Sequence, residues 1–410
     1  MIRTPLRLAA LVAATALVPS PAGATTSGGH ITSRPQGPVL IGDMAVLGVA
    51  REQQPEWMAP IAAGVSLYGV SAPPPVGRPA RGGATAAADA FGPVALAGGS
   101  SAGAVAWRGG GGLASALVAS ETLALTDRVD HPVAGSLRAV AVAAPANAGH
   151  VVAWSDDGGL HARWVAPGGT AGDPVAVTGG PARSFRLTAA SDGRAWLVWS
   201  EGGSLHALRL AADGTAERFD AGPVPARWQQ RAGSAGDLWI LVRSPAGSTL
   251  WRLGASAPAA GVMVPGAGFL DASATEAVVA SPGQSPRRAV VHRFGVAHTR
   301  TRIKLPSRSA LAGLAVEPGG RTHLMLRAGG DAALLSPGAA PTLLARRSDP
   351  RGAVAGTGVV AVATSRVYHE EENEDGGGSS AETMRYETLH VLAGHRVAKI
   401  RAILDGYDSF

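Results

Sequence analysis

Val152-Ala153-Trp154-Ser155-Asp156-Asp157-Gly158-Gly159-Leu160-His161-Ala162 is the stretch that decides the fold of this chain. It joins an apolar run ending in tryptophan to a leucine-led run through a glycine-rich turn. The unit recurs around Val105-Ala106-Trp107 and Leu197-Val198-Trp199, so the tryptophans lie 47 residues (107 to 154) and 45 residues (154 to 199) apart. Asp-Gly and Gly-Gly supply the positive φ of a two-residue hairpin loop, so each unit is expected to be a strand pair. A strand pair that repeats about every 45 residues predicts a radial array of β-sheets.

Flanking strands complete each repeat. The clearest block has expected strands at Leu137 to Ala143, His150 to Ser155, Leu160 to Val165 and Pro174 to Val177. Four short strands joined by tight turns make one propeller blade. Six such blocks run from Ser136 to Arg401, and Val94 to Val118 forms another upstream. Residues 40–86 supply either an eighth block or the strand that closes the ring. The predicted fold is therefore all-β, a β-propeller of seven or eight four-stranded blades, with a solenoid or a pair of sandwiches as the alternative.

The repeated side chains have structural roles in this prediction. Large rings fill the wedge between neighbouring blades, so Trp107, Trp154 and Trp199 are expected to pack there and not to serve as sugar platforms. His161 and His206 occupy equivalent positions in successive blocks, too far apart to share one zinc ion, and are expected to be polar, outward-facing strand residues. Asp156 and Asp157 are expected to form the turn, with a pair of functional carboxylates as the alternative.

The N-terminal residues 1–24 have the organisation of a secretory signal peptide. Arg3 and Arg7 precede an apolar run from Leu8 to Val18, and small residues ending at Ala24 offer a cleavage site. The apolar run is too short to span a bilayer, which takes about 20 residues. We therefore predict a secreted, extracellular protein, with cell-wall association left open. The predicted organisation is a signal peptide (1–24), a flexible leader (25–39), a single propeller domain (40–401) and a C-terminal tail (402–410).

Composition restricts how such a fold can be held together. None of the 410 residues is cysteine, which excludes disulfides and a lipid-anchored cysteine and leaves core burial as the source of stability. The 56 glycines and 29 prolines are typical of a turn-rich chain and not of a helical one. Arginine supplies nearly all the positive charge, a bias associated with bacterial proteins from GC-rich genomes.

A basic stretch extends from Arg287 to Arg351 and contains twelve arginine or lysine residues but three aspartate or glutamate residues. Cations at this density, gathered on one face, attract polyanions. The candidate polyanion-binding residues are Arg287, Arg288, Arg300, Arg302 and Lys304. Phe294 is the one aromatic ring of the stretch, and base stacking needs several, so nucleic acid is disfavoured as the partner. An arginine-rich surface without a dedicated partner is the alternative.

An acidic segment lies between two expected strands, Val359 to Tyr368 and Thr383 to Leu392. Its carboxylates are Glu370, Glu371, Glu372, Glu374 and Asp375. Oxygen ligands of this kind bind Ca²⁺, but the alternating spacing that aims several of them at one ion is missing. A mobile acidic loop is therefore expected, with a calcium site as the alternative, and no other cofactor is predicted.

The repeat period and hairpin arrangement of residues 40–401 resemble those of secreted bacterial β-propeller repeat proteins, including the sialidase-like propellers. Ser155-Asp156-Asp157-Gly158-Gly159 matches the first half of the sialidase Asp box, Ser-x-Asp-x-Gly-x-Thr-Trp, but Ala162 occupies the aromatic position. The resemblance implies a propeller fold. Sialidases use a tyrosine nucleophile, and none of the four tyrosines has a matching context, so their activity is not carried over.

No acid, base, nucleophile or metal-binding group emerges that would predict catalysis, and no catalytic residue is assigned. Gly99-Ser100-Ser101-Ala102-Gly103 has the letters of a nucleophile elbow, but it lies between two β-runs and not at a strand-to-helix turn. The predicted function is a secreted, non-enzymatic scaffold for a protein or polysaccharide partner, with anionic cell-wall or extracellular polymers as candidates. The alternative is a glycoside hydrolase or lyase with its site in the central funnel, where propeller loops converge.

Overall fold

The structure is a computed structural model that describes residues 29–42, 44–55, 62–71, 82–88, 92–109, 112–146, 149–182, 184–223, 227–233, 236–244, 247–254, 259–373, 379–394 and 396–408. These residues form 32 β-strands and no helix. The described part of the chain accordingly has no helix with the length and apolarity needed to cross a bilayer. The predicted signal peptide and its cleavage site at Ala24 lie outside the described residues.

The strands form eight blades of four consecutive strands each. Blades 1 to 4 consist of β1 (Gly29–Ile41), β2 (Met44–Pro55), β3 (Ala62–Ser71), β4 (Gly82–Ala88); β5 (Val94–Ala97), β6 (Ala102–Gly109), β7 (Gly112–Ala119), β8 (Leu125–Pro132); β9 (Ala139–Ala143), β10 (His150–Asp156), β11 (Gly159–Val165), β12 (Val175–Thr178); β13 (Phe185–Ala189), β14 (Ala195–Glu201), β15 (Ser204–Leu210) and β16 (Ala216–Pro223).

Blades 5 to 8 consist of β17 (Arg227–Ala232), β18 (Leu238–Ser244), β19 (Gly247–Leu253), β20 (Ala259–Val264); β21 (Phe269–Ala272), β22 (Ala277–Pro282), β23 (Arg288–Phe294), β24 (His298–Lys304); β25 (Ser309–Val316), β26 (Thr322–Ala328), β27 (Asp331–Leu335), β28 (Thr342–Ala345); β29 (Asp349–Gly356), β30 (Val359–Asn373), β31 (Ser379–Ala393) and β32 (Arg396–Asp408). Every strand pair within a blade is antiparallel.

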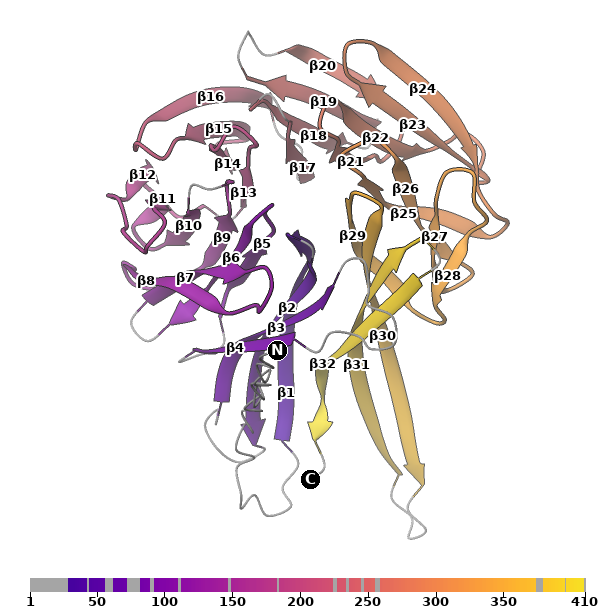
Figure 1. The fold of residues 1–410 in the computed structure, drawn as a ribbon, viewed down its shortest axis with the longest axis horizontal. Coiled ribbons are helices and arrows are strands. Elements are labelled where there is room, and N and C mark those ends of the chain that lie inside the picture. Colours follow the sequence, from indigo (N-terminus) through magenta and orange to yellow (C-terminus); the bar gives the residue numbers. More distant parts are fainter. Residues whose placement is uncertain are drawn as a thin grey trace, which may run out of the picture.

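The blades are arranged as a ring (Figure 1), and the first strands of five of them line a cavity at its centre, the central channel. The first strand of each blade contacts the first strands of its neighbours, from β1 and β5 round to β29 and back to β1, so the eight first strands line the channel. The predicted β-propeller fold is confirmed, and the blade number is eight. Residues 40–86, for which two roles were open, lie within blade 1, a complete four-stranded blade.

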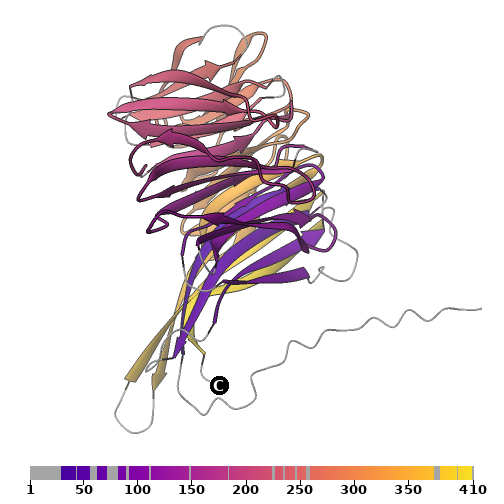
Figure 2. The same ribbon diagram turned by 90° about the vertical axis from the view of Figure 1, so that its left-hand side faces the viewer.

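The propeller domain extends beyond both of its predicted ends, residues 40 and 401. β1 begins at Gly29, inside the segment expected to be a loose leader, and β32 continues to Asp408, inside the expected tail. The physical reason is pairing: Gly29 to Ile31 pair with Gly406 to Asp408, which joins blades 1 and 8 into one eight-stranded sheet. Strands of these two blades extend beyond the disc of the other six, as the side view shows (Figure 2).

The hydrophobic core lies between the blades. Trp107 packs with Val46 and Leu67 of blade 1, and Trp199 packs with Val151 and Leu160 of blade 3. Trp154 packs with Ala104 and Ala106 of blade 2. Each ring therefore fills the space toward the preceding blade, and all three are at most 2% exposed. The predicted wedge-filling role of these tryptophans is confirmed.

Burial on both faces explains why the second strands read as continuous apolar runs. All seven residues of β10 are buried, because a blade has a neighbour on each side. In contrast, six of the seven residues of the outermost strand β24 are exposed. The hairpin loops use the expected chemistry: Gly202 and Gly203, with φ of 59° and 82°, link β14 to β15.

Candidate functional site

The predicted polyanion-binding residues lie at the outer edge of blade 6, on β23, β24 and the turn before β23. The strand register places Lys304 opposite Arg288, Arg302 opposite Val290 and Arg300 opposite His292. Residues directly opposite one another point to the same face of a sheet, and alternate residues of a strand do so as well. Arg288, Arg300, Arg302 and Lys304 therefore share one face. With Arg287 from the preceding turn, these five residues form what we call the basic rim.

The basic rim carries positive charge without nearby negative charge. All five side chains are exposed. Within the described part of the chain, none of them forms a salt bridge, which means that no carboxylate oxygen lies within 4.0 Å. At one end of this face His292 Nδ1 lies 3.2 Å from His298 Nε2. Burial lowers the pKa of His292, and the charges of His298 and Arg300 lower it further.

The rest of the basic stretch does not join this face. Arg293, on the opposite side of β23, forms an ion pair with Glu276 and donates to the carbonyl of Gly320. Arg327 pairs with Asp349 at 2.7 Å in blades 7 and 8. The fold thus gathers part of the predicted basic surface and distributes the remainder.

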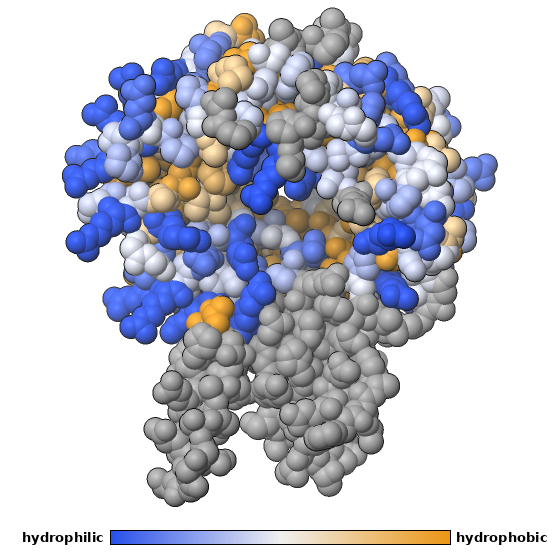
Figure 3. Space-filling model, turned by 180° about the vertical axis from the view of Figure 1, so that it is seen from behind, coloured by the Kyte–Doolittle hydropathy of each residue, from blue (hydrophilic) through white to orange (hydrophobic). Residues whose placement is uncertain are grey.

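A second group of cations, which the sequence analysis missed, lines the central channel. The first strand of a blade faces the channel, and arginines from three such strands line a channel cavity: Arg186 on β13, Arg231 on β17 and Arg351 on β29. Arg227 at the start of β17 and Arg243 on β18 line an adjoining cavity of about 470 Å³. Hydrophilic side chains border the hollow at the centre of the ring in the space-filling view (Figure 3). We call the cavity lined by Arg186, Arg227 and Arg243 the arginine cavity.

The guanidinium of Arg243 is poorly compensated. Its Nε and Nη2 atoms are buried and have no hydrogen-bond partner among the described residues. The group lies over the ring of Phe269, 4.7 Å from the ring centroid. Burial lowers the pKa of Arg243, and the neighbouring charge of Arg227 adds to that shift. Burial likewise lowers the pKa of Arg186, with a further contribution from Arg231.

Asp271 provides counter-charge for Arg231 next to the channel. Asp271 Oδ1 accepts a hydrogen bond from Arg231 Nε at 2.8 Å, and its Oδ2 accepts one from the backbone N–H of Val316 at 2.8 Å. Among the described residues that line the arginine cavity and the adjoining channel cavity of about 380 Å³, none is Asp or Glu. Both cavities therefore favour anions over cations.

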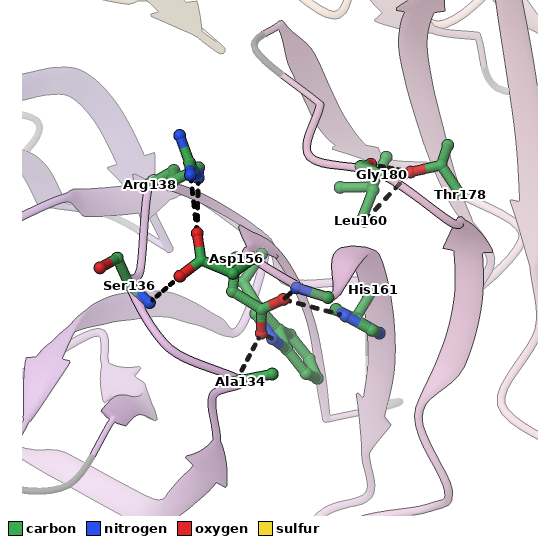
Figure 4. Close-up of polar contacts among 11 residues, drawn as sticks. Ala134, Ser136, Arg138, Asp156, Leu160, His161, Thr178 and Gly180 are labelled. Carbon is green, nitrogen blue, oxygen red and sulfur yellow. Dashed lines mark hydrogen bonds and ion pairs between the residues drawn. The ribbon is translucent and has the colours of Figure 1, made fainter.

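Asp156 and Asp157 stabilise the turn and the connection between blades 2 and 3. Asp156 is 1% exposed and accepts hydrogen bonds from the backbone N–H of Ala134 and Gly158 and from Trp154 Nε1 (Figure 4). Burial alone would raise the pKa of Asp156, but these hydrogen bonds and His161 lower it below its ordinary value. Asp157 accepts from Arg138 and from the N–H of Ser136. The turn-forming interpretation is supported, and the two carboxylates have separate structural partners.

His161 and His206 repeat the same contact in successive blades. His161 stacks on Trp154 with ring centroids 5.3 Å apart, and His206 stacks on Trp199 at 5.4 Å. Both side chains are partly exposed, and each has its own carboxylate, Asp156 or Asp220. They belong to different blades, as expected. Among the described residues no three His, Asp, Glu or Cys side chains are grouped closely enough to hold a metal ion.

A buried polar cluster joins blades 2 and 3 without any preceding sequence signal. Ser115 Oγ lies 2.7 Å from His131 Nε2 and 2.8 Å from His150 Nε2. The three residues are at most 2% exposed. Burial lowers the pKa of His131 and of His150 to about 4. Both imidazoles are therefore neutral near pH 7, and the cluster is structural because it is closed to solvent.

The acidic segment differs from its expected backbone conformation. β30 continues to Asn373 and β31 begins at Ser379, so Glu370, Glu371 and Glu372 belong to a strand pair and not to a loop. Their backbone pairs with Glu382, Ala381 and Ser380. The register shows the cause, since the pairing of β30 with β31 continues past Tyr368. Their side chains, and Glu374 and Asp375 altogether, lie outside what the structure describes, so the calcium site stays a prediction.

The arginine cavity had a recoverable sequence signal. Arg186 lies within Phe185 to Ala190, the first expected strand of its block, and first strands line a propeller channel. An arginine in a first strand could therefore have been placed at the channel. Arg243 gave no such signal, because it lies at the end of a second strand and reaches the cavity only through its pairing opposite Arg227.

No family model matches the chain, and no curated protein matches its sequence. Among solved structures, the β-propeller domain of the Trilobed protease from Pyrococcus furiosus is similar with a TM-score of 0.46 and 6% identity, over 91% of this chain and 97% of that one. A protein from Lactobacillus plantarum gives a TM-score of 0.43 and 15% identity, over 72% and 94% of the two chains.

A further similar structure comes from a study of two prolyl endopeptidases, with a TM-score of 0.47 and 10% identity. That match covers 89% of this chain and 55% of the endopeptidase chain. The assignment of the fold rests on the strand pairing of the chain itself, which forms eight four-stranded blades.

Proposed function

We propose that this protein is a secreted, non-enzymatic scaffold that binds an anionic polymer of the cell wall or extracellular matrix through the basic rim. The observation that carries the proposal is the set of five exposed cations on β23, β24 and the adjacent turn, none of which forms a salt bridge with a described carboxylate. Exposed cations keep their charge and lose little hydration until a polyanion neutralises them.

The arrangement suits a polymer better than a single small ion. Arg300, Arg302 and Lys304 alternate along one strand, so successive charges are separated by about 7 Å. A flexible chain with regularly repeated phosphate or carboxylate groups can contact several of them at once. Each contact releases counter-ions, which makes the affinity fall as the salt concentration rises.

The test is retention on an immobilised polyglycerol phosphate, with uncharged dextran as the matrix control. Replacing Arg300, Arg302 and Lys304 together by Gln should weaken retention by about tenfold or more. Retention of the unmodified protein should fade as added salt shortens the Debye length from about 10 Å to about 3 Å. A matched control replaces three exposed cations of blade 7, Arg321, Arg346 and Arg347, by Gln and should leave retention nearly unchanged.

Two results would contradict the proposal. Retention that does not depend on salt would show that charge is not its basis. Equal losses in the two triple variants would show that net charge and not the basic rim is responsible. The proposed secretion is tested separately: intact-mass measurement of exported protein should give a chain that begins at Thr25, after cleavage at Ala24.

The hydrolase or lyase alternative receives less support. Glycoside hydrolysis generally uses two carboxyl groups separated by about 5–9.5 Å across the bound sugar. The described lining of the arginine cavity and of the adjoining channel cavity contains no carboxylate, and nearby Asp271 is engaged by Arg231 and Val316. We therefore place binding ahead of catalysis.

A further inference from the structure

The arginine cavity collects three cations from three different strands of two blades. Arg186 belongs to β13, Arg227 to β17 and Arg243 to β18, and all three line one cavity of about 470 Å³. Apolar and aromatic side chains, among them Val140, complete its wall. Small-molecule sites typically occupy about 300–1,000 Å³ and combine such walls with a few polar groups.

Two of these cations are forced together by the fold. Arg227 and Arg243 are direct partners in the β17–β18 register, and side chains in such positions have Cβ atoms about 4.5–5.5 Å apart. Like charges directly opposite each other are unfavourable in a sheet. Their mutual repulsion agrees with the lowered pKa of Arg243, which burial and Arg227 both favour.

No negatively charged side chain among the described lining residues offsets this repulsion. None of them is a carboxylate, and Nε and Nη2 of Arg243 are buried without an acceptor. A buried donor without a partner is unfavourable, and more so when it belongs to a charged group. In contrast, Arg231 in the neighbouring channel cavity has Asp271 at 2.8 Å. The arginine cavity is therefore a place where an added anion would relieve an existing electrostatic strain.

We propose that the arginine cavity binds a compact anion that carries at least two carboxylate or phosphate groups. Three guanidinium groups need more than one negative charge for neutralisation. The planar guanidinium matches the geometry of carboxylate and phosphate oxygens, to which it can donate two parallel hydrogen bonds. This site is separate from the basic rim, since the rim lies on outer strands of blade 6 and the cavity on inner strands of blades 3, 4 and 5.

The experiment is isothermal titration calorimetry of the full chain at low salt with citrate and with pyrophosphate, and with acetate as the low-charge control. Citrate or pyrophosphate should bind with a dissociation constant below about 1 mM, and acetate should bind at least tenfold more weakly. Arg227→Gln, which changes an exposed side chain, should weaken binding by about tenfold or more. Arg243→Gln should do the same. The Gln variant of Arg300, Arg302 and Lys304 should bind these anions as the unmodified protein does.

Thermal unfolding shows whether the Arg243→Gln variant is still folded, so that a loss of binding can be assigned to the missing guanidinium. Without ligand the variant should be at least as stable as the unmodified protein, because it loses a like-charge contact with Arg227. Citrate should raise the Tm of the unmodified protein and not that of the variant. Binding of citrate alone or pyrophosphate alone would identify carboxylate or phosphate as the preferred group. The proposal would be overturned if the unmodified protein bound neither citrate nor pyrophosphate. It would also be overturned if Arg227→Gln and Arg243→Gln both bound these anions as tightly as the unmodified protein does.

Discussion

Truncation of Trp154 tests the idea that rings wedged between blades hold this disulfide-free fold together. Trp154 is 2% exposed, and it packs against blade 2 on one side and stacks on His161 at 5.3 Å. Its Nε1 donates a hydrogen bond to buried Asp156 Oδ2 at 3.1 Å. Trp154→Ala removes the ring, the stacking and this donor in one change.

The expected loss follows from the buried area. A tryptophan buries about 150–250 Å², and about 25 cal/mol per Å² gives about 4–6 kcal/mol. The compactness of the unfolded chain reduces this value, so we expect the free energy of unfolding to fall by about 3–5 kcal/mol, as it does for buried aromatics in general. Urea denaturation followed by circular dichroism measures the change. Trp154→Phe, which keeps a ring but loses the donor to Asp156, serves as the matched variant and should lose about 1–3 kcal/mol.

A loss below about 1 kcal/mol for Trp154→Ala would refute this reasoning. The ring would then contribute little to the contact between blades 2 and 3, and a role for Trp154 as an accessible sugar platform would have to be considered again. Equal losses in the Ala and Phe variants would show that the hydrogen bond to Asp156, and not the packed ring, dominates.

Two further predictions concern pH. The folded-state pKa of His131 and of His150 is about 4, below the ordinary 6.5, so the folded protein binds fewer protons than the unfolded chain between these pH values. The free energy of unfolding should therefore be highest above pH 6.5 and fall by about 3 kcal/mol per histidine toward pH 4. Urea denaturation across that pH range measures the change. Burial raises the pKa of Glu387 from 4.5 to about 7 against the opposing charges of Arg351 and Arg385, so ionisation above pH 7 disfavours the folded state. Glu387→Gln should therefore be more stable than the unmodified protein by about 2–3 kcal/mol at pH 8, with little difference at pH 4.5, and equal stability at pH 8 would contradict the assignment.

The basic rim shows how far local sequence can predict which side chains share a face. Strand alternation alone puts Arg300, Arg302 and Lys304 on one face, and the structure has this arrangement on β24. The addition of Arg288 depended on the β23–β24 register, which a short hairpin fixes locally. Arg293, which belongs to the same basic stretch of the sequence, lies on the other side of β23, where it contacts Glu276 and Gly320.

The sequence by itself determined the hairpins and their repetition. Trp154, Trp199 and the Gly202-Gly203 turn specify local strand pairs, and local pairing needs only neighbouring residues. Repetition about every 45 residues then favoured a ring of blades over a solenoid or a pair of sandwiches. The tryptophans were predictable for the same reason, since any face-to-face stack of blades needs large rings between them.

Only the tertiary structure decided the blade number, the domain ends and the arginine cavity. The number is eight because β1 to β4 form a complete blade, and the domain ends lie further out than predicted because Gly29 to Ile31 pair with Gly406 to Asp408, residues that no local pattern connects. The cavity forms because blades 3, 4 and 5 pack side by side, so Arg186 lies in one wall with Arg227 and Arg243 although they are far apart in sequence. Contacts of this kind depend on how neighbouring blades pack, which individual residues do not specify.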